Sequence, residues 1–491
     1  MGNRAVVLYT WLVRGHFHPM VLFADRLAGY GVPVTLAIAD VPSSSSSSST
    51  VARLSSSYPS VSFHLLPVAT ARSGDEADPD ADPFITLIAD LRATTPHLVD
   101  FLKSILSVMA VVVDFFWGCA LDSVADLGLP AYMFFTSGAS ALAAYLHIPV
   151  MASNVSFGDM GRSLLHLPGV HPAVPATDLP QVLLAHHDNE QYKATIGLFE
   201  QIVRAKRVLA NTYERLEPAA VKAMRDGSPR PGELVPRLFC VGPLVGDERG
   251  GERGTHEFLM TWLDAQAPRS VVFLCFGSAS SVPAEQLREI AVGLERSGHA
   301  FLWAVRAPVA PGADSTKRFE GRDEAAALED LLPDGFLART CGRELVVSTW
   351  APQVEVLRHA AIGTFVTHCG WNSILEAITA GVPMVYCPMY AEQRLNKGYD
   401  DGLVTAQEVE AKVRLVMESE EGKELKKKVA VAKDKAAAAF KSGGSSEKAF
   451  VDFLNGIESS STLGWNGQGS RTSVTFSFLQ CSTYWDFLCG N

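Results

Sequence analysis

A strand, a turn and a helix in the second half of the chain carry the residue types of a phosphate-binding site. A short apolar strand over residues 363–367 runs into a turn that contains His368, and a helix begins near Asn372. The start of that helix faces the carboxyl end of a strand, so unpaired N–H groups and the positive end of the helix dipole form an anion site suited to a diphosphate. His368, Asn372 and Ser373 supply donors at this tip. Glu376 lies one turn below, where a carboxylate accepts hydrogen bonds from a ribose diol.

Two flanking features extend this site. Trp350 precedes the strand and offers a flat face to a base, and stacking of this kind contributes about 1–3 kcal/mol. Glu392 and Gln393 follow the next apolar strand, residues 383–387, and are suited to hold the hydroxyl groups of a further unit. Base, ribose, diphosphate and hydroxylated unit together describe a nucleotide sugar.

A histidine and an aspartate follow strands near the start of the chain. A strand, a helix and a second strand are expected over residues 5–9, 20–28 and 32–38. Ligands of such a doubly wound unit bind at the carboxyl ends of strands. His16, in the loop that runs to Pro19, and Asp114, at the end of a strand over residues 110–113, are therefore where chemistry is expected. Taken alone, a loop histidine has no assigned role, and an aspartate at a strand end also caps the helix that follows.

The residues from Trp350 to Gln393 resemble the signature box of the plant family of UDP-sugar-dependent glycosyltransferases that act on small secondary metabolites. The match runs across all 44 positions, and the resemblance as a whole covers roughly residues 4–458. An ordinary buried β-α-β unit explains only the Val, Ile, Leu and Gly positions, so the motif is specific. The resemblance implies that a UDP-sugar is bound by Thr136, Ser278, Trp350, Ala351, Gln353, His368, Trp371, Asn372, Ser373, Glu376, Glu392 and Gln393.

The same resemblance implies an α/β fold of two Rossmann-like, doubly wound domains that face a cleft, which is the GT-B architecture. We expect an acceptor-binding domain over residues 1–240 and a UDP-sugar-binding domain over residues 259–458. A Gly-rich, charged stretch marks the linker between them, residues 241–258. The last helix is expected to pack back on the first domain, and residues 459–491 form a tail unlike the family.

The resemblance also assigns the chemistry. His16 matches the family's catalytic histidine in its Gly-His-x-x-Pro context, and Asp114 matches the aspartate that pairs with it. A phenolic hydroxyl has a pKa of about 10, so a base poised near neutrality is needed to take its proton. The implied reaction is the inverting transfer of glucose from UDP-glucose to a hydroxyl of a small phenolic acceptor such as a flavonoid, with no metal and no other cofactor. Gln393 resembles the glucose-preferring members, which favours UDP-glucose as the donor.

The composition is that of a globular protein without a nucleic-acid or membrane partner. The 491 residues are 47% hydrophobic and carry a formal net charge of -11, which argues against nucleic-acid and anionic-membrane surfaces. We expect no signal peptide, and we find no apolar run of the roughly 18 residues that a membrane helix needs. The eight cysteines form no CxxC pattern and are expected to be reduced. We therefore expect a cytoplasmic protein that acts as a monomer.

Three features depart from the family pattern. Residues 10–14 are bulky where the family has small residues and prolines, and the tail after Glu458 is aromatic. After Lys397 the chain lacks a helix and a strand that members have, and each buried group left unpaired costs about 1–3 kcal/mol. A catalytically impaired UDP-sugar-binding homologue is therefore the alternative. A nicotinamide-dependent oxidoreductase would need GxGxxG after the first strand, where only Gly15 is present, and an NAD-sugar epimerase would not need the His-Asp pair.

Overall fold

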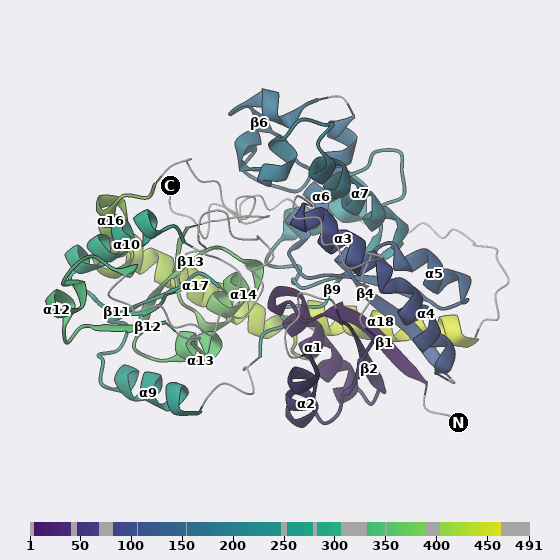
Figure 1. Ribbon diagram of the computed structural model, residues 1–491, viewed down its shortest axis with the longest axis horizontal. Coiled ribbons are helices and arrows are strands. Elements are labelled where there is room, and N and C mark those ends of the chain that lie inside the picture. Colours follow the sequence, from purple (N-terminus) through teal and green to yellow (C-terminus); the bar gives the residue numbers. More distant parts are fainter. Residues whose placement is uncertain are drawn as a thin grey trace, which may run out of the picture.

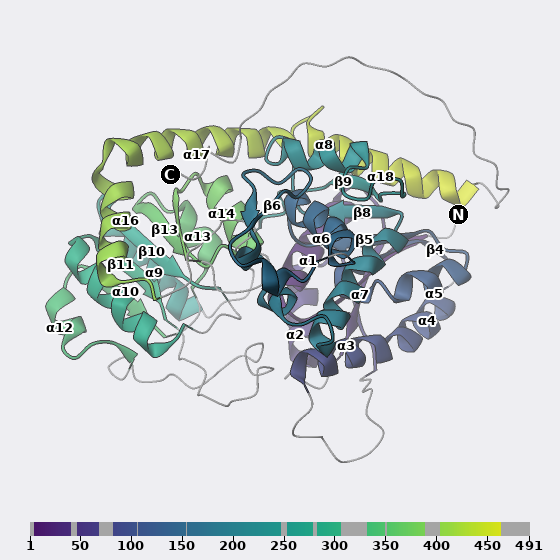
Figure 2. The same ribbon diagram turned by 90° about the horizontal axis from the view of Figure 1, so that it is seen from above.

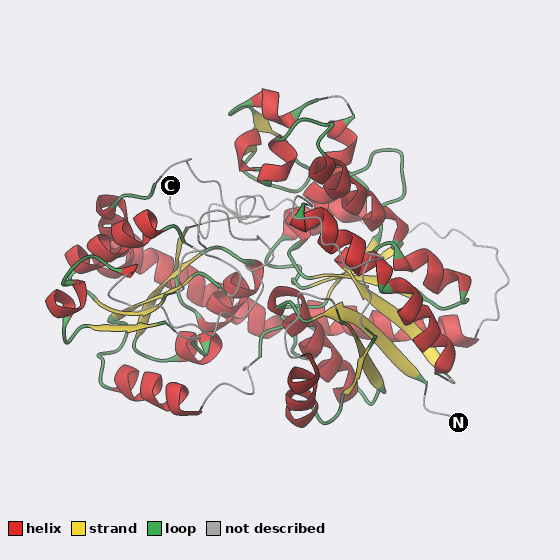
Figure 3. Ribbon diagram, in the orientation of Figure 1, coloured by secondary structure: helices red, strands yellow, loops and turns green. Residues whose placement is uncertain are grey.

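Two α/β units make up the protein, each built on a parallel sheet (Figure 1, Figure 3). This confirms the expected fold class of two doubly wound units. The computed structural model describes residues 4–40, 47–67, 82–105, 107–153, 155–246, 253–277, 282–305, 331–348, 351–387 and 403–462. Among the helices in these segments, none combines the length and the apolar character that a membrane crossing requires.

The first unit contains a seven-stranded sheet in the order β3-β2-β1-β4-β5-β8-β9, and all its strands are parallel. Near-continuous apolar runs such as β1 and β4 are typical of strands that are buried on both faces. Along β1, Val7 and Tyr9 belong to one core, and Val6 and Leu8 belong to the other. The strands are β1 (Ala5–Trp11), β2 (Val34–Ala39), β3 (Ser62–Leu65), β4 (Val108–Asp114), β5 (Ala131–Phe135), β8 (Arg207–Ala210) and β9 (Arg237–Cys240).

Helices cover both faces of this sheet. The helices of the first unit are α1 (Arg14–Gly29), α2 (Ser47–Ser57), α3 (Pro83–Ala93), α4 (Thr95–Ser104), α5 (Ala120–Asp126), α6 (Ala139–Ala152), α7 (Glu190–Arg204) and α8 (Pro218–Asp226). Helices α3 to α7 supply one core, and α1 supplies the other. A small lobe between α6 and α7 contains β6 (Leu164–Leu165) and β7 (Val174–Pro175) with the short helices η2 (Phe157–Met160), η3 (Ala176–Asp178) and η4 (Gln181–Leu184).

The second unit contains a five-stranded parallel sheet in the order β12-β11-β10-β13-β14. Its strands are β10 (Val271–Cys275), β11 (Ala300–Ala304), β12 (Glu344–Val347), β13 (Ile362–Thr367) and β14 (Met384–Tyr386). Its helices are α9 (Arg253–Asp264), α10 (Ala284–Ser297), α12 (Phe336–Thr340), α13 (Gln353–Arg358), α14 (Trp371–Ala380), α16 (Ala406–Glu418) and α17 (Glu420–Ala439). As the Gly-Val-Pro sequence predicts, α14 ends at Gly381 in the left-handed conformation, with φ of 79°.

The last described helix, α18 (Ser445–Thr462), lies against the first unit. Figure 2 shows α17 running along the second unit towards the first, where α18 continues. Phe450 and Phe453 are fully buried beside Phe23 of α1, with ring centroids 5.2 and 5.8 Å apart from it. The end of the chain therefore contributes to the core that α1 helps to form.

The structure corrects the sequence expectation for the start of α1. The helix was expected over residues 20–28 after a loop, but it begins at Arg14 and contains Pro19. Proline is normally a mark of the first helical turn, which is why the sequence pattern placed the start too late. His16 therefore lies in the first turn of a helix and not in a loop.

Other expectations concern residues that the structure describes only in part. Within the predicted linker, Val241 and Leu244 are buried and α9 begins at Arg253. The junction after Lys397 and nearly all of the tail, from residue 463 onwards, lie outside the described segments. In the part of the second sheet that the structure describes, β12 and β14 are the two edge strands.

Candidate active site

His16 and Asp114 lie side by side at the carboxyl edge of the first sheet. His16 follows β1 in the first turn of α1, and Asp114 is the last residue of β4, the strand that pairs with β1. His16 Nδ1 and Asp114 Oδ2 are 2.9 Å apart, and Asp114 is fully buried whereas the His16 side chain is 20% exposed. A carboxylate on Nδ1 favours the tautomer whose proton is on Nδ1 and whose lone pair is on Nε2.

Asp114 serves both roles that its position suggests. Its Oδ2 contacts His16, while its Oδ1 accepts a hydrogen bond from the Phe116 amide at 3.0 Å and so caps the short helix η1 (Phe115–Trp117). The backbone donor fixes the carboxylate plane. The cap therefore orients the same group that orients the histidine.

Aromatic rings pack around His16. The ring centroids of Phe116 and Trp11 are 5.1 and 6.0 Å from the imidazole, and Trp11 also contacts Trp117. Trp11 is one of the bulky residues where the family pattern has small ones. Because the Trp11 side chain is only 3% exposed, it packs into the protein interior against the turn that contains His16.

His368 begins the turn between β13 and α14. Burial lowers the pKa of His368 to about 4, although a hydrogen bond with the Cys275 backbone has the opposite, smaller effect on this pKa. The imidazole is therefore neutral at physiological pH. Two glycines approach the ring closely: a Cβ at Gly277, which has φ of 78°, would lie 2.6 Å from the His368 ring, and a Cβ at Gly370 would impinge on the same ring.

Glu376 and Ser373 of α14 are joined through Gln353, the first residue of α13. Gln353 Nε2 donates to Ser373 Oγ at 2.9 Å and to Glu376 Oε2 at 2.6 Å. Burial raises the pKa of Glu376 to about 7, against the lowering effects of Gln353, Arg14 and Arg358. This carboxyl group therefore titrates near neutrality.

Of the remaining predicted residues, the structure describes some and leaves others outside the described segments. Thr136 follows β5 at the same sheet edge as Asp114 and is half-buried, and Ala351 is buried in the core of the second unit. The Trp371 indole N–H donates to the Asn211 carbonyl at 2.7 Å, so this side chain contacts the first unit. Ser278, Trp350, Glu392 and Gln393 lie outside the described segments.

The starts of α1 and α14 meet. Asn372 Nδ2 donates to the Gly15 carbonyl at 3.1 Å, and Asn211 Nδ2 donates to Asn372 Oδ1 at 3.5 Å. Sequence reasoning missed Asn211, which follows β8 as an ordinary strand-end residue and belongs to no motif. The contact places the helix start expected to bind a diphosphate next to the turn that carries His16.

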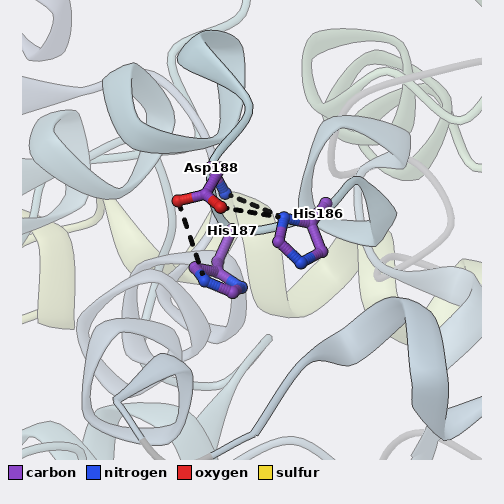
Figure 4. Close-up of side chains that lie close together, drawn as sticks. All are labelled: His186, His187 and Asp188. Carbon is purple, nitrogen blue, oxygen red and sulfur yellow. Dashed lines mark hydrogen bonds and ion pairs between the residues drawn. The ribbon is translucent and has the colours of Figure 1, made fainter.

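A cluster of His186, His187 and Asp188 is the one group of potential metal ligands that the described segments bring together (Figure 4). All three side chains are more than 60% exposed. His186 Nδ1 accepts from the Asp188 amide at 3.3 Å, and Lys193 Nζ lies 3.9 Å from Asp188 Oδ1. These contacts account for the cluster as a charged surface turn before α7.

Comparison with known proteins relates most of the chain to one family. The family model described as UDP-glucoronosyl and UDP-glucosyl transferase matches residues 249–424. UDP-glycosyltransferase 88F4 of Malus domestica is 37% identical to this chain, over 93% of this chain and 100% of that protein. A phloretin 2'-O-glucosyltransferase of the same plant is 35% identical, with the same two coverages.

A solved structure agrees with this relation in three dimensions. The crystal structure of Medicago truncatula UGT71G1 complexed with UDP-glucose has a TM-score of 0.77 and is 30% identical, over 92% of this chain and 98% of that chain. The arrangement of two doubly wound units described above is thus the arrangement of that protein.

Proposed function

The chain belongs to the plant UDP-glycosyltransferase family, and from this membership we propose that it transfers glucose from UDP-glucose to a hydroxyl of a small phenolic acceptor, such as a flavonoid. Phloretin, a phenol, is named as the acceptor of one relative, and UDP-glucose is bound in one related structure. These names support a UDP-glucose donor and a phenolic acceptor for this chain.

The observation that carries the mechanism is the 2.9 Å contact between His16 Nδ1 and Asp114 Oδ2. His16 is the general base: its Nε2 takes the phenolic proton while the acceptor oxygen attacks. The proton gives the imidazole a positive charge, which the neighbouring Asp114 carboxylate stabilises. Because the carboxylate is buried, its attraction for the imidazolium is only weakly screened by water.

The transfer exchanges one bond for another at the anomeric carbon. The acceptor oxygen bonds to that carbon on the face opposite UDP, and the bond to the diphosphate oxygen breaks with its electron pair leaving on UDP, so the configuration is inverted. The donors of His368 and Ser373 and the start of α14 stabilise the charge that develops on the diphosphate. Since burial lowers its pKa to about 4, His368 acts as a neutral donor.

The other predicted residues are proposed to hold the donor. Glu376 accepts hydrogen bonds from the ribose, with Gln353 fixing its carboxylate. Trp350 stacks on the base, and Glu392 and Gln393 hold sugar hydroxyls. Thr136, Ser278, Ala351, Trp371 and Asn372 complete the proposed UDP-sugar site.

The proposal requires no metal, so chelation with EDTA is expected to leave the rate of glucoside formation unchanged. It also assigns a cytoplasmic location and a monomeric state. A rate that falls on chelation and returns with added magnesium would contradict the metal-free mechanism.

The test combines binding and turnover. UDP is expected to raise the thermal midpoint of the purified protein, and incubation with UDP-glucose and a flavonoid panel is expected to yield a glucoside. His16→Ala should retain the UDP-induced shift and lose the product by at least about a hundredfold, since general-base catalysis contributes about 10²–10⁴-fold.

The second candidate is a UDP-sugar-binding homologue without catalytic activity. It is favoured by the direct passage from Lys397 into the residues that precede α16, where the family has a helix and a strand. A UDP-induced thermal shift without any glucoside from a broad acceptor panel would support this candidate over the transferase.

A further inference from the structure

We infer that Asn211 is a positioning residue that connects the segment between the two units, residues 241–246, to the turn of His16 through Asn372. This inference deepens the proposed function and rests on it. It concerns how the base on the first unit and the donor site on the second are held in register.

Three hydrogen bonds form a continuous relay. The Leu244 amide donates to Asn211 Oδ1 at 2.8 Å, Asn211 Nδ2 donates to Asn372 Oδ1 at 3.5 Å, and Asn372 Nδ2 donates to the Gly15 carbonyl at 3.1 Å. Asn211 is fully buried. The relay thus begins in the connecting segment and ends one residue before His16.

Backbone groups at the two ends fix the direction of the relay. The Leu244 N–H can only donate, so it faces the carbonyl oxygen of the Asn211 side chain, and the amide nitrogen of Asn211 faces Asn372. The Gly15 carbonyl can only accept, so it faces the amide nitrogen of Asn372. Each side-chain amide has one orientation that satisfies both of its neighbours.

Pro19 makes the last acceptor available. In a helix, the carbonyl of residue 15 normally accepts from the N–H of residue 19, but proline has no N–H. The Gly15 carbonyl therefore lacks its usual partner within α1 and accepts from Asn372 across the two units. This explains why a proline inside α1 is compatible with the site.

Two close contacts hold Asn211 in this position. Its backbone carbonyl accepts from the Trp371 indole at 2.7 Å, so Asn211 contacts the first two residues of α14. A Cβ at Gly242 would lie 2.6 Å from Asn211 Oδ1, so only glycine lets the connecting segment approach so closely. Loss of the Asn211 amide leaves the Leu244 N–H and Asn372 Oδ1 without these partners.

The relay bears on the rate because the reacting groups belong to different units. The phenolic oxygen is aligned by His16, whereas the anomeric carbon is held by groups on α14. Small displacements between a base and a bound substrate are costly to turnover. Asn211→Ala is expected to lower kcat by about fivefold to tenfold, the effect of losing a hydrogen bond or two. KM for UDP-glucose should stay within about twofold, because the groups that touch the donor remain.

Pro19→Ala tests the same relay from its other end. It supplies an N–H that competes with Asn372 for the Gly15 carbonyl, and kcat is expected to fall about fivefold. Pro149→Ala is the matched control, because Pro149 also lies inside a helix, α6, and the three hydrogen bonds of the relay involve no residue of that helix. The double variant Asn211→Ala/Pro19→Ala should be no slower than the slower single variant, since both changes interrupt one chain of contacts.

Several results would overturn the inference. One is an unchanged kcat in Pro19→Ala, a test that remains available if Asn211→Ala does not fold. The second is a double variant in which the two losses of kcat multiply. The third is a loss of kcat in Pro149→Ala equal to that in Pro19→Ala. If the wild-type protein forms no glucoside, the proposed function fails separately. In that case the relay is tested by the thermal midpoints of the wild-type protein, the two single variants Asn211→Ala and Pro19→Ala, and their double variant. Additive losses of the thermal midpoint in the double variant would contradict the relay.

Discussion

At the scale of single residues, two buried carboxyl groups differ in what surrounds them. Asp114 contacts an imidazole and a backbone amide. The Glu376 carboxyl group accepts a hydrogen bond from the neutral side chain of Gln353, and burial raises its pKa to about 7. We therefore expect Asp114 to serve the proton transfer and Glu376 to report on donor binding.

Asp114→Asn is expected to reduce kcat about a hundredfold while the Kd of UDP changes little. The amide keeps a similar shape but lacks the charge that stabilises an imidazolium, and general-base catalysis contributes about 10²–10⁴-fold. Steady-state rates and calorimetric titration with UDP check this. Asp122→Asn, an exposed aspartate in an ion pair with Arg204, is the control and should leave both quantities unchanged. A comparable loss in the control would contradict the role of Asp114.

The binding of UDP-glucose should tighten as the pH rises through about 7. The raised pKa means that Glu376 is largely protonated below this value, and the ionised carboxylate is the form that accepts from both ribose hydroxyls. Bound donor favours the ionised form, so affinity increases with pH by about fivefold. Glu376→Gln should abolish this dependence, and His16→Ala should retain it. A flat profile in the wild-type protein would rule out a titrating ribose ligand.

At the scale of elements, apolar runs and strand ends made much of the site predictable. The strands before His16 and Asp114 were found because near-continuous apolar residues mark buried parallel strands. The helix after His368 was found because Gly381, with Pro383 beyond it, marks a helix end. The start of α1 was not predicted correctly, because a proline such as Pro19 normally marks the first turn of a helix. Asn211 could not be predicted, since its role arises only when residues 15, 211, 244 and 372 meet in the folded protein.

Gly370→Ala should weaken UDP-glucose binding about tenfold by displacing the His368 ring, on which the added methyl group would impinge. Gly370 has φ of -60°, so alanine fits the backbone and the effect arises from the contact alone. Overpacking of this kind costs about 1–3 kcal/mol. Titration calorimetry measures the change, with Gly197→Ala as the control because that position has open space. Equal affinities of the two variants would show that His368 tolerates the methyl group.

At the scale of the whole molecule, α18 ties the end of the chain to the first sheet. Phe453 is fully buried among Phe23, Tyr132 and Phe239. Phe453→Ala is expected to lower the free energy of unfolding by about 3–5 kcal/mol, as large-to-small changes of aromatic core residues do. Chemical denaturation followed by tryptophan fluorescence checks this. Val431→Ala of α17 is the control, since Val431 is 44% exposed. A loss below that of the control would mean that α18 adds little to the first unit.

The position of α18 also sets an order of events during synthesis. Domains of a growing chain generally fold as units, the N-terminal one first. Here the core around Phe23 includes Phe450, Phe453 and Ile457. That core cannot close until these residues have emerged from the ribosome, by which time the sequence of the second unit has already been made. The part of the protein that is translated first is therefore completed last, and until then the apolar side chains around Phe23 lack the aromatic residues that cover them in the folded protein.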